Sequence, residues 1–452
     1  MLKSHNKYVL FLYNYYEVII IRIHYISFGC KVNLYETECV KELLVYEGYE
    51  ISESEKDADI FLINTCTVTS ESDKKLRKTI NRIKKSYPGA VIGLMGCFVQ
   101  AFPDKAKELN AEILIGNGNK TEILSALRRY HECKAKQLYI NDNSVNSRFE
   151  PMCLEGFQKK TRAFLKIQDG CNQFCTYCII PKARGRICSK PVDEIKKEVE
   201  ILAENGYKEV VIVGINLSFY GKEFGLRLID AIETACSVDG IERVRLGSLE
   251  PEVISDEDIE RMSNQKKLCP QFHLSLQSGC DRTLKAMNRH YSSEEYAEIV
   301  EKLRSAFENC AITTDIMVGF PDETEEDFEK SYNFVKKMNF SQAHIFPYSK
   351  REGTIAYKME NQVNESVKNE RAKKMAEITN KSHTEFMKSH INGVYPVLFE
   401  REQSPEFHNG HTPDYLFIKV LKKSCEKSLR NQIFYVKIDK IENDCCIGHI
   451  IQ

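Results

Sequence analysis

The chain lacks an excess of charge of either sign. Its 64 lysines and arginines are balanced by 65 aspartates and glutamates, which gives a formal net charge of −1. A protein that attracts nucleic acid through its overall field is strongly basic. A nucleic-acid partner must therefore be met by local patches. One helical segment, residues 72–87, carries a basic run that could touch RNA or simply be solvated: Lys74, Lys75, Arg77, Lys78, Arg82, Lys84 and Lys85.

The chain also lacks an apolar run long enough to cross a membrane. Residues 8–21 are apolar and rich in tyrosine, but Asn14 and Glu17 interrupt them and no small-residue cleavage site follows. The stretch is too short for a membrane span and does not have the pattern of a signal peptide. We expect a soluble cytoplasmic protein without a membrane partner. Residues 1–20 are interpreted as an extension, either disordered or the product of a mis-assigned start.

A dense disulfide framework is absent as well. The 17 cysteines are odd in number and scattered over 452 residues, unlike the closely spaced cysteines of a small secreted domain. This usage favours a reducing compartment in which some cysteines bind metal. The length allows two or three domains with adequate cores.

Three cysteines nevertheless gather in one short loop. Cys171, Cys175 and Cys178 stand at i, i+4 and i+7, directly after an apolar strand and an Asp-Gly pair. Tetrahedral zinc normally takes four protein ligands, and no histidine lies close enough in sequence to supply the fourth. An iron–sulfur cube also prefers four thiolates, so three would leave one iron open for another ligand. A reactive metal centre is the favoured interpretation; a structural zinc knuckle or a chance cluster of buried thiols is the alternative.

A second group of cysteines is predicted from topology. Apolar strands and helices alternate in the first part of the chain, with strands at 21–28, 60–64, 91–95 and 113–115 and helices at 36–46, 72–87, 104–109 and 121–130. This alternation predicts a doubly wound parallel sheet, in which all strands present their carboxyl ends at one ligand-binding edge. Cys30, Cys66 and Cys97 each follow a strand end, so we expect three distant thiols to meet there. A single cysteine at such a position is more often a packing residue.

The middle of the chain predicts a partial barrel. Six apolar strands, at 163–167, 209–213, 243–246, 271–276, 313–318 and 342–346, alternate with helices at 192–204, 228–236, 256–262, 294–307 and 325–338. Six units are too few for a closed eight-fold barrel, and the catalytic face should lie at the strand carboxyl ends. Lys166, Asp169, Arg184 and Arg186 flank the cysteine loop. The positive charges of the lysine and the two arginines could meet a phosphate or a carboxylate of a ligand, or be solvated.

The end of the chain changes to short β-type runs at 395–399, 415–420 and 432–438. A small all-β barrel is expected, a class that often binds nucleic acid, although it could also only pack on the preceding domain. The predicted fold class is thus α/β, with a doubly wound N-terminal domain, a partial (β/α)6 barrel and a C-terminal β barrel. The predicted limits are 21–137, a linker at 138–156, then 157–387 and 388–452.

The cysteine loop, with Tyr177 before its last cysteine, resembles the cluster signature of radical S-adenosylmethionine (SAM) enzymes. Within that superfamily, the chain from about residue 21 onward resembles the methylthiotransferases, with a tail similar to the RNA-binding TRAM domain. The N-terminal segments that carry the resemblance are 29–33 (GCKVN), 64–69 (NTCTVT) and 96–97 (GC). Those of the barrel are 184–186 (RGR), 245–251 (RLGSLEP), 273–279 (HLSLQSG), 287–289 (MNR), 319–321 (GFP) and 348–354 (YSKREGT).

The resemblance implies roles for the two cysteine groups. Cys171, Cys175 and Cys178 would hold the 4Fe–4S cluster that cleaves SAM, while Cys30, Cys66 and Cys97 would hold an auxiliary 4Fe–4S cluster that carries the sulfur. It also implies that the barrel residues nearest the strand ends bind the cofactor. These are Tyr177, Gly214, Ser248, Glu250, Gln277 and Pro321.

The implied activity is the methylthiolation of carbon 2 of N6-threonylcarbamoyladenosine at position 37 of tRNA. The residues around Cys30 and Cys66 favour this branch over the isopentenyladenosine branch, which tends to carry Gln-Met in place of Lys31 and Val32. The implied partners are tRNA, a sulfur donor and a flavodoxin- or ferredoxin-type reductant, and the enzyme is expected to be a monomer. A non-catalytic iron–sulfur protein that binds RNA or senses redox state is the alternative from a different class.

Overall fold

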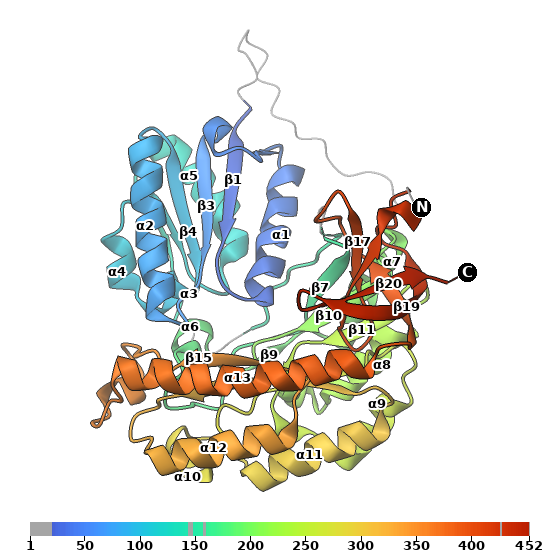
Figure 1. Cartoon of the computed structure of the whole chain (residues 1–452). Helices are drawn as coiled ribbons and strands as arrows, with labels where there is room; N and C mark the ends of the chain where they lie inside the picture. Colours follow the sequence, from blue (N-terminus) through green and yellow to red (C-terminus); the bar gives the residue numbers. More distant parts are fainter. Residues whose placement is uncertain (1–19, 143–147, 157–159, 425–426, 452) are drawn as a thin grey trace.

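The computed structural model describes residues 20–142, 148–156, 160–424 and 427–451. Figure 1 shows an α/β domain built from the first third of the chain, a barrel-like α/β domain below it, and a small β barrel at the carboxyl end. This arrangement confirms the predicted fold class. The domain limits predicted from the sequence stay predictions, and the predicted extension at residues 1–20 lies outside the described residues except for Ile20. Among the helices of the described ranges, none is long and apolar enough to cross a membrane.

The N-terminal domain is a parallel sheet with helices on both faces. Its strands are β1 (Arg22–Ser27), β2 (Glu50–Ile51), β3 (Ile60–Thr65), β4 (Val91–Gly96), β5 (Ile113–Ile115) and β6 (Gln137–Tyr139), in the order β2-β1-β3-β4-β5-β6. Its main helices are α1 (Lys31–Tyr46), α2 (Ser70–Ser86), α4 (Pro103–Lys107) and α5 (Ile123–Cys133). Every residue of β3 is buried, as expected for an apolar run covered on both faces of a parallel sheet.

In the N-terminal domain, the structure adds two short strands and one short α-helix to the prediction. The strands β2 and β6 have two and three residues, too few to show a periodicity, and β6 overlaps the start of the predicted linker. The helix α3 (Cys97–Ala101) is a single buried turn directly after β4. The helix α1 begins at Lys31, five residues before the predicted start, because Cys30 occupies its N-cap position.

The second domain is an open, six-stranded parallel barrel. One sheet contains β7 (Arg162–Lys166), β10 (Glu209–Val213) and β11 (Arg243–Leu246); the other contains β12 (Ser248–Leu249), β13 (Gln271–Leu274), β14 (Ala311–Val318) and β15 (Gln342–Pro347). The strands β11 and β12 are one predicted unit interrupted at Gly247. Within the described residues β15 does not pair with β7, so the barrel is open, as six units predict.

Helices cover the outside of this barrel, and their ends follow local capping rules. They are α7 (Val192–Glu204), α8 (Leu228–Ser237), α9 (Asp256–Ser263), α11 (Ser293–Ala306), α12 (Glu325–Met338) and the long α13 (Glu365–Ser389), which lies along β15. The hydroxyl oxygens of Ser292 and Thr324 accept hydrogen bonds from backbone amides three residues later, so these residues cap the N-termini of α11 and α12.

The C-terminal domain is a closed five-stranded barrel. Its strands are β16 (Val394–Phe399), β17 (Phe407–His411), β18 (Phe417–Leu421), β19 (Ile433–Glu442) and β20 (Cys445–Ile450), in the closed order β16-β17-β18-β20-β19. The sequence did not predict β17 and β20, because His408, Asn409 and the adjacent cysteines Cys445 and Cys446 do not give a β-type pattern. Its core contains the apolar residues of β16, β18 and β19.

This small barrel packs on the second domain through buried polar contacts. Arg245 donates to the backbone oxygens of Pro413 and Thr412, and its guanidinium lies 4.7 Å from the centre of the Tyr415 ring. At the end of α13, His390 Nε2 lies 2.6 Å from the carboxylate of Asp414, and both side chains are buried. These contacts fix the C-terminal barrel to the body of the protein.

The His390–Asp414 pair predicts a pH dependence of stability. Burial lowers the pKa of His390, but the hydrogen bond and charge of Asp414 outweigh it, so the pKa lies above its usual value. A raised folded-state pKa stabilises the fold below about pH 6.5, and this contribution is lost as the pH rises through the folded-state pKa. Urea unfolding at a series of pH values should show this fall for the wild type and a smaller fall for His390→Gln. An equal fall in both proteins would contradict the assignment.

Candidate functional site

Three cysteines of the N-terminal domain meet at the carboxyl edge of its sheet. Cys30 follows β1, Cys66 follows β3 and Cys97 follows β4, and these three strands are neighbours in the sheet. A methyl group added to Gly29 would come within 3.1 Å of Cys66 Sγ, and Gly29 has a φ of +101°. The backbone of the first loop therefore lies directly against the second cysteine. The three thiols also interact electrostatically with one another. The topology thus brings them together as predicted.

The surroundings of these thiols suit sulfur ligands. Burial raises the pKa of Cys30 and Cys66, and Arg184 opposes this for Cys30. Asn117 Nδ2 lies 3.4 Å from Cys97 Sγ. Amide donors and a nearby cation stabilise the thiolate relative to the thiol, and the thiolate is the form that binds metal.

The second cysteine group lies in the loop that follows β7. The short strand β8 (Gln168–Asp169) pairs with β9 (Cys188–Ser189), and the loop leaves this ribbon through Gly170. Gly170 has a φ of +70°, and a methyl group there would lie 1.8 Å from the backbone oxygen of Arg186. Only glycine fits this turn. The Cys171 amide then donates to the backbone oxygen of Gly185 at 3.1 Å, which folds the loop back against α6 (Ile180–Arg184).

Hydrogen-bond donors point at each sulfur of this loop. Asn216 Nδ2 lies 3.5 Å from Cys171 Sγ, Arg289 Nη1 lies 3.4 Å from Cys175 Sγ, and the amide of Ile180 lies 3.5 Å from Cys178 Sγ. Burial, reinforced by Cys175, raises the pKa of Cys178 to about 12. The three thiols lie close enough to influence one another electrostatically.

Neither group forms a closed site for one ion. Among the described residues, no set of three cysteine, histidine, aspartate or glutamate side chains converges closely enough to hold a single metal ion. A cube instead binds each thiolate through a different iron. Each site offers three thiols with nitrogen donors around the sulfurs, which fits an iron–sulfur cube.

The six predicted cofactor-binding residues follow strands of the barrel or belong to the cysteine loop. Three of them are packing residues and three are polar. Tyr177 packs edge-on against Phe320, with 6.4 Å between ring centres, and Phe320 directly precedes the buried Pro321. Gly214 follows β10, and a methyl group there would come within 3.0 Å of Gln168, whose side-chain oxygen accepts from the amides of Ile215 and Asn216. Tyr177, Gly214 and Pro321 thus occupy tightly packed positions.

The other three predicted residues are polar. Glu250 forms an ion pair with Arg289, the same arginine that contacts Cys175, so the carboxylate is linked to the cysteine loop. Burial raises the pKa of Glu250 although Arg289 opposes this. Ser248 is exposed on β12. Gln277 adopts a φ of +64°, and its amide donates to the backbone oxygen of Asp315 at 2.9 Å.

A cavity of about 350 Å³ lies beside the cysteine loop. Cys175 and Cys178 form part of its wall, together with Phe174, Lys182, Arg186 and the segment 353–355. None of the six predicted cofactor-binding residues lines it. The cavity was not foreseen, because its wall joins segments that lie almost 180 residues apart.

Two of the charged residues that flank the loop, Lys166 and Arg184, are buried, whereas Arg186 is exposed. Lys166 and Arg184 are 2% and 1% exposed and form ion pairs with Asp169, so the interpretation of a solvated face is wrong for them. Both also contact Glu36 of α1, a residue that the sequence did not single out. An acidic residue inside a helix gives no local signal of such a role. Arg186 instead lies over the Phe174 ring.

Several residues of the basic run on α2 form contacts within the N-terminal domain. Arg82 forms a bidentate ion pair with Glu55, and Lys84 pairs with Glu112. Lys75 lies over the Phe28 ring. These contacts reduce the number of cations that α2 can offer to RNA.

Comparison with known proteins agrees with this geometry. Residues 165–335 match the radical SAM superfamily, and residues 22–116 match the family described as uncharacterized protein family UPF0004. In solved structures, the radical SAM methyltransferase TsrM from Kitasatospora setae, with cobalamin and a 4Fe–4S cluster bound, has a TM-score of 0.54. It covers 73% of this chain and 72% of its own at 10% identity, which shows a shared fold. The fold and the cysteine loop thus define a radical SAM enzyme, whose cofactors are SAM and a 4Fe–4S cluster.

Curated relatives narrow the class. The threonylcarbamoyladenosine tRNA methylthiotransferase MtaB of Bacillus subtilis is 38% identical over 424 residues, 92% of this chain and 93% of the relative. The tRNA-2-methylthio-N(6)-dimethylallyladenosine synthase of Alkaliphilus oremlandii is 34% identical over 442 residues, 94% and 92% of the two chains. The chain belongs to the tRNA methylthiotransferase family of radical SAM enzymes.

Proposed function

We propose that this enzyme methylthiolates carbon 2 of N6-threonylcarbamoyladenosine at position 37 of tRNA, using two 4Fe–4S clusters. The observation that carries the proposal is the pair of three-cysteine sites on adjacent domains. The helix α3, which begins at Cys97, packs on α6, which begins two residues after Cys178. Asn117 spans this contact, since its side-chain nitrogen lies 3.4 Å from Cys97 Sγ and 2.7 Å from the backbone oxygen of Ala183.

The two sites divide the work between them. When bound, SAM and the first cluster would supply radical chemistry, and the second cluster would supply the sulfur to be transferred. Cys171, Cys175 and Cys178 hold the first cluster, and Asn216 and Arg289 orient the loop through their contacts to sulfur. Tyr177, Gly214, Ser248, Glu250, Gln277 and Pro321 are proposed to line or support the SAM position. The ligands of the second cluster are Cys30, Cys66 and Cys97.

The nucleoside assignment rests on the N-terminal motifs. The segments GCKVN and NTCTVT surround Cys30 and Cys66, and four relatives named as threonylcarbamoyladenosine enzymes are 33–39% identical. The alternative is isopentenyladenosine, since relatives named for dimethylallyladenosine reach 33–36%. Membership of an enzyme family leaves no specific support for a non-catalytic sensor.

The remaining partners follow from this reaction. The C-terminal barrel and the basic run of α2 are proposed to bind tRNA. A sulfur donor must restore the auxiliary site after each turnover, and a flavodoxin- or ferredoxin-type protein must supply electrons. We propose a cytoplasmic monomer for this role.

Mass spectrometry of tRNA nucleosides tests the substrate. We expect a strain that lacks both types of methylthiotransferase to gain methylthio-threonylcarbamoyladenosine when it expresses this chain. The variant Cys171→Ala, expressed to the same level, should produce none. Appearance of methylthio-isopentenyladenosine alone would assign the chain to the other branch and contradict the proposal.

A further inference from the structure

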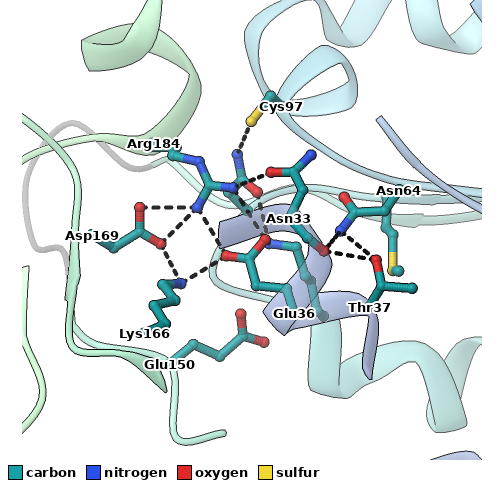
Figure 2. Close-up of polar contacts among 12 residues, drawn as sticks. Asn33, Glu36, Thr37, Asn64, Cys97, Glu150, Lys166, Asp169 and Arg184 are labelled. Atoms are coloured by element: carbon teal, nitrogen blue, oxygen red, sulfur yellow. Dashed lines mark hydrogen bonds and ion pairs between the residues drawn. The ribbon is translucent and has the colours of Figure 1, made fainter. Parts of the chain in front are cut away.

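A buried group of charges joins the two cysteine sites. Glu36 of α1 is fully buried, and its Oε1 accepts from Lys166 Nζ at 2.7 Å and from Arg184 Nη1 at 2.8 Å. Its Oε2 lies 3.2 Å from Lys120 Nζ, which is also fully buried. Figure 2 shows Glu36, Lys166 and Arg184 converging between the N-terminal domain and the barrel. Glu36 therefore contacts cations from both domains.

One side of this network reaches the N-terminal cysteines. Arg184 Nη2 donates to Asn33 Oδ1 at 2.7 Å, and Cys30 Sγ lies 3.8 Å from the same oxygen. Asn33 Nδ2 donates to the backbone oxygen of Thr65, the residue before Cys66.

The third cysteine is reached through Lys120. Its Nζ donates to Asn117 Oδ1 at 2.7 Å, and Asn117 Nδ2 contacts Cys97 Sγ. The network thus touches all three loops that carry these cysteines.

The other side reaches the loop of Cys171. Asp169 lies two residues before that cysteine, and its carboxylate accepts from Arg184 Nη1 at 2.9 Å and pairs with Lys166 Nζ at 2.5 Å. Lys166 is the last residue of β7, so the same two cations hold both the strand end and the start of the loop.

The cost of burying these groups argues for a positional role. Desolvation of buried ion pairs often cancels their attraction, and an apolar replacement can be equally stable. Burial would raise the pKa of Glu36, yet Arg184, Lys120 and Lys166 together hold it well below its usual range. A carboxylate held in one geometry by three cations is suited to fixing a spacing.

We propose that Glu36 is a positioning residue that sets the spacing between the auxiliary cysteine site and the cysteine loop of the barrel. The inference rests on the proposed function, because a defined spacing matters only if sulfur must reach a carbon activated at the other site. A shift of this interface would let SAM be cleaved without transfer of sulfur. Loss of Glu36 should therefore uncouple the two half-reactions.

A second buried pair at the same interface provides the control. Glu198 of α7 pairs with Lys190 and accepts from Tyr35 Oη of α1 at 2.9 Å, so it also joins the two domains. Neither glutamate is exposed by more than 1%. The described contacts of Glu198 do not reach a cysteine loop. Glu36→Gln and Glu198→Gln therefore remove the same charge from the same interface in different places.

The experiment compares these variants after anaerobic reconstitution. We expect wild type, Glu36→Gln and Glu198→Gln to hold equal iron and sulfide. With tRNA, Glu36→Gln should form severalfold more 5′-deoxyadenosine per methylthiolated nucleoside, while Glu198→Gln keeps the wild-type ratio. The magnetic interaction between the two reduced clusters, measured by electron paramagnetic resonance, should change only in Glu36→Gln.

If Glu36→Gln does not fold, Lys120→Gln provides a second variant, because it removes the contact from Glu36 through Asn117 to Cys97. We expect the same rise in the ratio of 5′-deoxyadenosine to methylthiolated nucleoside. An unchanged ratio and an unchanged magnetic interaction in the folded variants would overturn the inference while the wild type still makes product. Equal changes in Glu198→Gln would also overturn it, because they would show a general interface effect. A wild type with one cluster or no methylthiolated product would instead overturn the proposed function.

Discussion

Replacing Cys175 by alanine should abolish the formation of 5′-deoxyadenosine from SAM. Cys175 is one of three ligands in a loop that has no fourth thiol, and its sulfur is the one contacted by Arg289. The cysteines on which Cys175 acts electrostatically, Cys171 and Cys178, are the other two proposed ligands. Because the ligands act as a unit, we expect a loss of roughly 10³-fold or more.

The control for this prediction is Cys310→Ala, which removes a partly buried thiol directly before β14 and far from either site in sequence. It should leave 5′-deoxyadenosine formation near the wild-type level. Liquid chromatography of the quenched reaction, under anaerobic conditions with dithionite, measures both variants. Cleavage of SAM by folded Cys175→Ala at the wild-type rate would show that this loop does not hold the reactive cluster.

Replacing Cys97 by alanine should abolish methylthiolation but leave the cleavage of SAM intact. Cys97 belongs to the other domain and is buried at the start of α3. Its loss removes a ligand of the proposed auxiliary cluster but leaves the loop of Cys171 intact. We expect the methylthiolated nucleoside to fall by roughly 10³-fold or more, while 5′-deoxyadenosine formation stays within about threefold of wild type.

Cys39→Ala is the matched control for Cys97→Ala. Cys39 is a buried thiol of the same domain, but it lies on α1 and faces the core. It should cost some stability and keep both products in the wild-type ratio. If Cys97→Ala still formed methylthiolated nucleoside at the wild-type rate, the auxiliary role of the N-terminal cysteines would be wrong.

The fold was largely predictable because its main strands are continuous apolar runs. The predicted limits of β11, α7 and α12 agree with the structure to the residue. Each has a strong pattern and a clear local boundary, such as Pro191 before α7 or the capping box at Thr324. Strands without such a pattern were missed. The sequence of β17 does not look like a buried strand, because it contains the polar residues His408 and Asn409. Both are nevertheless buried, through tertiary contacts that the local sequence does not show.

The two cysteine groups were predictable for different reasons. The loop from Cys171 to Cys178 shows its spacing directly in the sequence. The meeting of Cys30, Cys66 and Cys97 follows from the common edge of a parallel sheet, which requires only the order of elements.

The network around Glu36 could not be predicted. Its members come from α1, β7, α6 and the turn before α5, and each reads locally as an ordinary surface charge. Burial of Lys120, Lys166 and Arg184 depends on how the two domains pack, and no short-range pattern encodes that packing. The positions of Ser248 and Gln277 relative to SAM likewise depend on tertiary geometry and stay predictions.

The central claim is that this chain holds two separate clusters. Counting iron and sulfide after anaerobic reconstitution tests it most directly, in the wild type and in triple cysteine-to-alanine variants of each site. Two 4Fe–4S clusters predict about eight iron and eight sulfide ions per wild-type chain and about four of each in either triple variant. About four of each in the wild type, with none left in the variant that lacks Cys171, Cys175 and Cys178, would contradict the account.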